Sequence, residues 1–130
     1  MRYLVLIYGS EQQWASMTPE AISEMLSGYN KYTQDLAEAG VLRAGDELQP
    51  VFTATTIRVR DGKTHTTDGP FAETKEQLGG YYMIETETLD EAIAWAAKCP
   101  GASYGSVEVR PVVVQSGDST NVQQAESAQA

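Results

Sequence analysis

The sequence is poor in cysteine, histidine and basic residues, and it contains no long hydrophobic run. Its 130 residues include one cysteine, Cys99, which excludes an internal disulfide framework and fits a reducing compartment. Nine Lys and Arg against eighteen Asp and Glu give a formal net charge of −9, which disfavours nucleic acid and anionic membranes as partners. The apolar run Tyr3–Tyr8 is too short to span a bilayer, and no signal-peptidase pattern follows it. We therefore expect a cytoplasmic protein.

Residues that would hold a metal or a cofactor are also scarce. No spacing of His, Cys, Asp and Glu resembles a zinc or iron site, and Gly79-Gly80 precedes an expected strand, unlike a phosphate-binding loop. We expect neither a metal nor a cofactor. Cys99 falls at a helix C-terminus, where the helix dipole opposes a thiolate, so packing is its favoured role. His65, the one histidine, is a candidate proton shuttle, but an exposed strand position is the favoured interpretation.

The chain does contain enough hydrophobic residues, 42%, to form one core. Short apolar or alternating runs bounded by turn residues predict strands over residues 2–8, 41–48, 53–60, 63–67, 80–86 and 106–114. Helices are predicted after the N-cap of Thr18-Pro19-Glu20 and after the capping box that begins at Thr88. Residues 115–130 show no apolar period and are predicted to be a disordered tail, which leaves residues 1–114 as one domain.

This order of elements predicts an α+β fold, a ferredoxin-like βαββαβ sandwich with an inserted β-hairpin turning at Asp61-Gly62. The strands at residues 2–8 and 80–86 are apolar on both faces, whereas two helices cover one face only. Leu, Tyr and Met side chains would then face water on the other side, and such a patch usually marks an interface. We predict a homodimer whose sheets pack face to face or along a shared edge. The alternative is that these are ordinary exposed hydrophobic residues.

The densest chemistry lies in the segment Asp-Gly-Pro-Phe-Ala-Glu-Thr-Lys-Glu at residues 68–76. Pro70 lacks an N–H and pushes Gly69 out of the helical region, so the segment is predicted to be a loop. Binding and catalytic groups often gather on loops held by flanking strands. The candidate catalytic residues are Asp68, Glu73, Lys75 and Glu76. The candidate substrate-binding residues are Phe71, Tyr82, Glu108 and Arg110.

Each of these candidates has a structural alternative. Asp68 would act as a general base if apolar neighbours raise its pKa, or else it caps its own turn. Lys75 would hold an anionic substrate while Glu73 or Glu76 moves a proton. Alternatively, these loop charges pair weakly in solvent, at about 0–1 kcal/mol each. The charged pair at residues 108 and 110 shares one strand face and either lines a cavity or forms an interface ion pair.

The segment at residues 68–76 resembles, letter for letter, the signature of the DGPFAETKE proteins of the YCII-related group. Further stretches across residues 1–114 are similar to that family, at residues 3–8, 48–50, 55–58, 79–81 and 105–111. The resemblance implies a dimeric α/β barrel of the ferredoxin-like type, similar to the muconolactone isomerase and antibiotic-biosynthesis monooxygenase folds. It also implies a setting beside extracytoplasmic-function sigma factors, hence a stress or regulatory role, without naming a substrate.

In shorter YciI-type relatives, a histidine near the start of the first helix and an aspartate are suspected of forming an acid–base pair. Here that helix start reads Pro19-Glu-Ala-Ile22, so the pair is not carried over. Two functional hypotheses follow. The first is a cofactor-independent enzyme that performs proton transfer on a small molecule in a pocket of the homodimer. The second is a non-catalytic ligand-binding or accessory protein in a stress response. A third interpretation makes residues 68–76 a structural clasp across the sheet.

Overall fold

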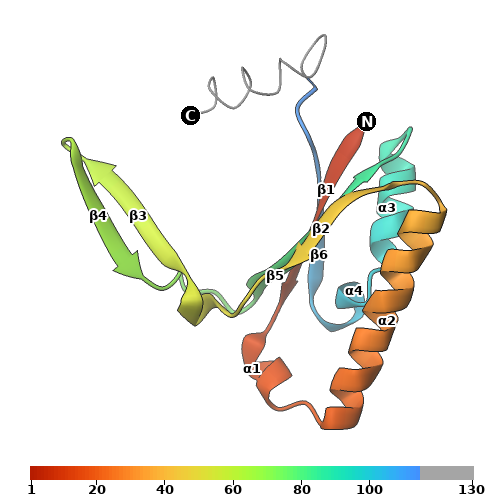
Figure 1. Ribbon diagram of the computed structural model, residues 1–130, viewed down its shortest axis with the longest axis horizontal. Helices are drawn as coiled ribbons and strands as arrows, with labels where there is room; N and C mark the ends of the chain where they lie inside the picture. The colour runs from red at the N-terminus through yellow and green to blue at the C-terminus, as the bar shows by residue number, and fades with distance from the viewer. Residues whose placement is uncertain (115–130) are drawn as a thin grey trace.

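The computed structural model describes residues 1–114, and Figure 1 shows a sheet covered by helices on one side, with a hairpin projecting on the other. The elements, in chain order, are β1 (Arg2–Gly9), α1 (Glu11–Ala15), α2 (Pro19–Glu38), β2 (Leu42–Glu47), the 3-10 helix η1 (Val51–Thr53), β3 (Thr55–Arg60), β4 (Lys63–Asp68), β5 (Gln77–Glu85), α3 (Leu89–Ala97), α4 (Gly101–Tyr104) and β6 (Ser106–Pro111).

The main sheet has the strand order β2-β5-β1-β6, and every neighbouring pair is antiparallel. Counted without the hairpin, this is the order expected of a ferredoxin-like βαββαβ fold, because each strand–helix–strand half places its two strands on either side of a strand from the other half. The predicted fold class is therefore confirmed. The hairpin β3–β4 forms a separate two-stranded sheet, inserted between β2 and β5.

Both long helices begin where the sequence predicts. The Thr18 Oγ1 accepts a hydrogen bond from the backbone N–H of Ala21, at 3.1 Å, and α2 starts at Pro19. The Thr88 Oγ1 accepts from the backbone N–H of Glu91, at 3.2 Å, and α3 follows. The chain leaves α2 at Gly40, whose φ of +75° is a conformation that favours glycine.

The core lies between the helices and one face of the sheet. Alternate side chains of β1 point to it, so Tyr3, Val5 and Ile7 are buried while Leu4, Leu6 and Tyr8 are half-exposed. Leu36 from α2 and Ile84 from β5 are fully buried against them. The remaining core residues are Tyr32, Ala92, Ala96 and Cys99. The favoured packing role of Cys99 agrees with this burial, and burial raises the pKa of its thiol.

Three short elements were not expected from the sequence: α1, η1 and α4. Each is five residues or shorter, which is too short for a recognisable apolar period. The strand β5 starts at Gln77, earlier than the predicted residue 80, and β6 ends at Pro111 instead of residue 114. The predicted tail, residues 115–130, lies outside the described residues. No helix within residues 1–114 is long and apolar enough to cross a membrane.

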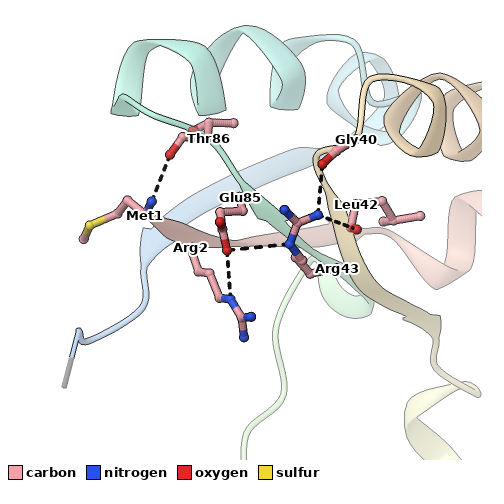
Figure 2. Close-up of polar contacts among 7 residues, drawn as sticks. All are labelled: Met1, Arg2, Gly40, Leu42, Arg43, Glu85 and Thr86. Atoms are coloured by element: carbon pink, nitrogen blue, oxygen red, sulfur yellow. Dashed lines mark hydrogen bonds and ion pairs between the residues drawn. The ribbon is translucent and has the colours of Figure 1, made fainter. Parts of the chain in front are cut away.

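No helix of residues 1–114 lies on the other side of the sheet, and we call that side the open face. Its centre is apolar, with Leu4, Leu6 and Met83 half-exposed on two neighbouring strands. Charged and polar residues surround that centre. Figure 2 shows one end of it, where the Glu85 carboxylate lies 3.2 Å from the Arg2 Nε and 3.6 Å from the Arg43 Nε, so that three adjacent strands are linked. These guanidinium groups lower the pKa of Glu85.

Candidate functional site

A cavity of about 450 Å³ lies on the helix-covered side of the sheet. It lies between α1, the N-terminal half of α2 and the β2–β5 edge of the sheet. It is mainly apolar, and its volume falls in the range of small-molecule sites. The lining residues are Ile7, Trp14, Met17, Ile22, Met25, Leu26, Tyr29, Asn30, Thr33, Gly45, Asp46, Glu47, Gly79, Gly80, Tyr81 and Tyr82.

Trp14 forms one wall of this cavity because two glycines let its ring come close to the sheet. A Cβ at Gly9 would lie 2.7 Å from the indole, and one at Gly79 would lie 2.8 Å from it. Any larger residue at either position would displace the ring. The short helix α1 holds Trp14, and its N-cap is Ser10, whose hydroxyl accepts a hydrogen bond from the Gln13 N–H at 3.2 Å.

Tyr82 forms part of the floor, and its position also depends on a glycine. A Cβ at Gly45, on the neighbouring strand, would lie 2.8 Å from the Tyr82 ring. The Tyr82 hydroxyl shares a hydrogen bond with the Thr33 hydroxyl at 2.7 Å, and burial raises the Tyr82 pKa. The ring packs edge-on against Tyr32, with centroids 5.3 Å apart. The phenol is therefore neutral near pH 7.

Tyr29 lies deeper, next to the core. Its hydroxyl is 3.9 Å from the Cys99 thiol, and a Cβ at Gly101 would lie 2.6 Å from that hydroxyl, so glycine is needed to make room for it. Burial is the main cause of a strongly raised Tyr29 pKa. Tyr29 and Tyr82 thus present neutral hydroxyl groups, which can donate and accept hydrogen bonds.

The charged side chain at the cavity rim is acidic. Glu47, the exposed last residue of the edge strand β2, pairs with Gly80 on this face of the sheet. Asp46 pairs with Tyr81, which lies opposite Leu6 on the open face, and its carboxylate accepts a hydrogen bond of 2.8 Å from the Tyr81 hydroxyl there. That carboxylate is the main cause of a raised Tyr81 pKa. None of the lining side chains within residues 1–114 belongs to Lys, Arg or His. The rim is therefore negative.

Of the eight site residues predicted from the sequence, Tyr82 alone lines this cavity. Asp68 is the exposed last residue of β4, paired with Thr55 across the hairpin. Glu73 and Lys75 are exposed between β4 and β5, and the Phe71 side chain is 79% exposed. The four candidate catalytic residues do not lie at the cavity of a single chain, and their roles stay predictions.

The last three candidates make polar contacts elsewhere. The Glu76 carboxylate accepts a hydrogen bond from the Ser106 hydroxyl at 2.7 Å, which connects the start of β5 to the start of β6. Such a bond is what the clasp interpretation requires. Glu108 and Arg110 form an ion pair on the open face of β6, and the Tyr8 hydroxyl also donates to Glu108, at 3.3 Å. Their position away from the cavity fits the interface alternative better than the lining one.

The sequence held one signal for the cavity that was not recognised. Ile22, Met25, Leu26 and Tyr29 recur at helical spacing, which predicts a face packed on the sheet. The strand segment facing them contains Gly79 and Gly80, which have no side chains to fill the space between helix and sheet. An apolar helix face opposite paired glycines is a pattern that predicts either tight packing or a cavity.

Comparison with known proteins identifies the family. The family model described as the YCII-related domain matches residues 1–116. This chain belongs to the YCII-related family. The chain is also similar to Uncharacterized protein R00369 of Rhizobium meliloti (strain 1021). The two are 39% identical over 116 residues, which cover 88% of this chain and 94% of that protein. The resemblance inferred from residues 68–76 is thereby confirmed.

A solved structure shows the same fold at much lower sequence identity. It is the 5-chloro-2-hydroxyhydroquinone dehydrochlorinase TftG from Burkholderia phenoliruptrix AC1100, in complex with 2,5-dihydroxybenzoquinone. The TM-score is 0.51 at 13% identity, over 88% of this chain and 96% of that one. At this identity the match supports the α+β fold alone. It does not transfer an activity to this YCII-related chain.

Proposed function

We propose that this protein binds a small, largely apolar molecule in the cavity between α1, α2 and the β2–β5 edge. The observation that carries the proposal is the chemistry of the lining: an indole, two methionines and aliphatic side chains around a few hydroxyl groups. Sites for small molecules generally combine apolar walls with a few polar groups that fix orientation. The exposed fractions of Ile22 and Leu26, 42% and 54%, show apolar surface that a ligand would cover.

The electrostatics favour neutral or cationic ligands over anionic ones. The Glu47 carboxylate lies at the rim, and the lining within residues 1–114 offers no basic side chain to balance it. Two like charges 4 Å apart repel by about 1 kcal/mol in water and by about 4 kcal/mol near a protein surface. A repulsion of about 1–4 kcal/mol corresponds to roughly fivefold to a thousandfold in affinity. It argues against the role expected for Lys75, which was to hold an anionic substrate at such a pocket.

A matched set of probes tests the proposal. Naphthylmethanol, naphthylmethylamine and naphthoate share one ring system and differ in charge. Thermal shift should show that the first two raise the melting temperature by several °C near a hundredfold excess over their dissociation constants, since saturation at that level contributes about 2.7 kcal/mol. Naphthoate, and 2,5-dihydroxybenzoquinone as a second acidic compound, should give smaller shifts.

Two variants test whether the probes bind in the cavity. Leu26→Arg puts a long cationic side chain among the lining residues and should abolish the shifts. Ile93→Arg introduces the same side chain on α3, where the isoleucine is 49% exposed and does not line the cavity, and it should bind as the wild type does. Equal shifts for wild type and Leu26→Arg, or no shift with any probe, would rule out the cavity as the site.

Proton-transfer catalysis is the second candidate, because the cavity carries the Glu47 carboxylate at its rim. A general base must come within hydrogen-bond distance of the proton that it removes. In a single chain Glu47 is the carboxylate at the cavity rim, whereas Asp68, Glu73, Lys75 and Glu76 would need a second subunit to bring them near. The test is exchange of solvent deuterium into a probe ketone that binds, with Glu47→Gln compared with Asp68→Asn. Exchange unaffected by either change would count against catalysis.

The open face supports a homodimer. An apolar centre of Leu4, Leu6 and Met83, surrounded by charged pairs, has the arrangement of a protein interface, with a dry core and a polar rim. The covering surface would be the same face of a second copy, as a two-fold interface requires. Sedimentation velocity at micromolar concentration should give the mass of two chains, and Leu6→Glu should give that of one. A wild-type monomer at that concentration would contradict the assembly.

A further inference from the structure

The hairpin β3–β4 has no support from the rest of its own chain. We call residues 55–68 the arm. None of its residues is buried, and all but Thr56 are exposed. An isolated two-stranded hairpin is at best marginally stable in water. Its order in the protein therefore calls for a surface to pack against, and the described part of this chain does not supply one.

The two faces of the arm differ sharply. In the register of β3 and β4, Ile57 pairs with Thr66 and Val59 pairs with Thr64. Ile57 is 61% and Val59 57% exposed on this face, and its one charged residue is Asp68, which pairs with Thr55 at the base of the arm. The opposite face carries a run of basic groups: Arg58, Arg60, Lys63 and His65. A solvent-exposed hairpin with no partner would not need an apolar stripe.

The base of the arm adds to the apolar surface. Phe52 in η1 and Phe71, just beyond β4, are 78% and 79% exposed. Burying one aromatic side chain removes about 150–250 Å² of surface from water, so two such rings are a large uncovered area for a chain of this size. Gly69 donates its N–H to the Ala54 carbonyl at 2.7 Å, which holds the two ends of the arm together.

The direction of the arm points to what covers it. In Figure 1 the arm extends on the side of the sheet opposite α2 and α3, which is the side of the open face. A second copy seated on the open face would therefore lie beside the arm. The second copy has the same arm in the same position. In a two-fold dimer, each arm would therefore lie against the other subunit.

Charge favours a second copy as the occupant. The arm holds three of the nine Lys and Arg residues of the chain, but only Asp61 and Asp68 of its eighteen acidic residues. The rest of the described chain is consequently strongly acidic. Because the arm is two strands wide, with strands about 5 Å apart, long basic side chains on its far face can extend past its edges toward acidic groups beside it.

We propose that the arm packs its Ile57–Val59 face on a second copy of this chain and pairs its basic side chains with that copy's acidic surface. The inference goes beyond ligand binding and rests on the homodimer proposed above. It assigns the inserted hairpin, rather than the sheet alone, a large share of the dimer's affinity.

Matched lysine pairs test the arm. Ile57→Lys/Val59→Lys adds two lysines to the apolar face, and His65→Lys/Thr67→Lys adds two to the basic face. Sedimentation equilibrium should show the first pair raising the dimer dissociation constant about 30-fold or more, and the second changing it less than about threefold. Circular dichroism provides the check that both variants keep the folded body. A third variant replaces residues 55–68 with Gly-Asn-Gly, and it should resemble the first.

The possible failures are distinguishable. A wild-type dimer whose dissociation constant is unchanged by the arm variants would overturn the arm proposal and leave the sheet-face dimer standing. A wild-type monomer would overturn both, while the thermal shifts with naphthyl probes would still test the cavity. Binding of short duplex DNA by the wild type, lost in Arg58→Ser/Arg60→Ser, would overturn the choice of occupant. If the arm's basic side chains pair with a second copy of this chain, Arg58→Ser/Arg60→Ser should instead make the dimer dissociation constant less dependent on salt concentration.

Discussion

The two halves of α2 carry similar apolar side chains toward the sheet but meet different surroundings there. In the C-terminal half, Tyr32 and Leu36 are 4% and 0% exposed, because β1 and β5 place large side chains beneath them. In the N-terminal half, Ile22 and Leu26 stay partly exposed over Gly79 and Gly80. The comparison teaches that one helix contributes core stability at one end and a cavity wall at the other, and that the strand opposite decides which.

The largest effect is expected from a cavity-creating change in the packed half. Leu36→Ala should lower the free energy of unfolding by about 2–5 kcal/mol, since the side chain is fully buried. Leu26→Ala, the same change in the other half, should lower it by less than about 1 kcal/mol. Urea denaturation measures both values. Equal losses would show that the two halves do not differ in the way proposed.

The next largest change in the free energy of unfolding is expected at high pH. Burial raises the pKa of Tyr32 and of Tyr29 above the value of about 10 that the unfolded chain retains. Because folding favours the neutral phenol, this stability is complete below pH 10 and is lost as the pH rises through the folded-state pKa. The loss should reach about 1.4 kcal/mol per pH unit for each such group.

Absorbance at 295 nm checks this prediction. Ionisation of these two phenols should coincide with the loss of far-ultraviolet circular dichroism, and Tyr32→Phe should make the unfolding step less steep by one proton. Their ionisation in a protein that remains folded would contradict the burial argument.

A single hydrogen bond in the packed half should matter less. The Tyr32 hydroxyl donates to the Trp95 carbonyl at 2.8 Å and joins α2 to α3. Tyr32→Phe keeps the ring contact with Tyr82 and should cost about 1 kcal/mol near pH 7. Tyr82→Phe serves as the cavity-side counterpart, since it removes the bond to Thr33. We expect Tyr82→Phe to lower the free energy of unfolding by less than Tyr32→Phe does, and to weaken the thermal shift that naphthylmethanol produces.

The smallest stability change is expected at the glycine beneath Trp14. Gly79→Ala forces the indole to move, because the new methyl group would lie 2.8 Å from it. Trp14 is half-exposed and can shift into solvent, so the free energy of unfolding should change by less than about 1 kcal/mol. The emission maximum, measured in a Trp95→Phe background, should move to longer wavelength. Unchanged emission would show that Trp14 does not depend on this glycine.

Local rules accounted for most of the fold. Thr18 and Thr88 were recognised as caps because their side chains satisfy backbone N–H groups within a few positions. Asp61-Gly62 was recognised as a turn because both residues accept the positive φ that a tight hairpin requires. The helix α1 was missed since its cap, Ser10, is followed by polar residues without an apolar period. Its placement depends on contacts far along the chain, such as the hydrogen bond from the Glu11 N–H to the Gln77 side chain at 3.0 Å.

The candidate site was harder to predict than the fold. The charged segment at residues 68–76 attracted attention because ionisable groups on a loop suggest chemistry. The cavity instead uses Trp14, Leu26 and other side chains that are ordinary core residues by type. Only the spatial arrangement distinguishes them, because a helix face becomes a cavity wall when the facing strand lacks side chains.

By itself the sequence determined the order of the six strands and the two longer helices, the family, and the two-sided apolarity of β1 and β5, since all three follow from residues that act locally or from a contiguous signature. The tertiary structure alone decided that the hairpin leaves the sheet as an arm and that a cavity opens over Gly79 and Gly80. Both depend on which distant segments meet. Such contacts are set by the packing of the whole chain, and no short stretch of residues encodes them.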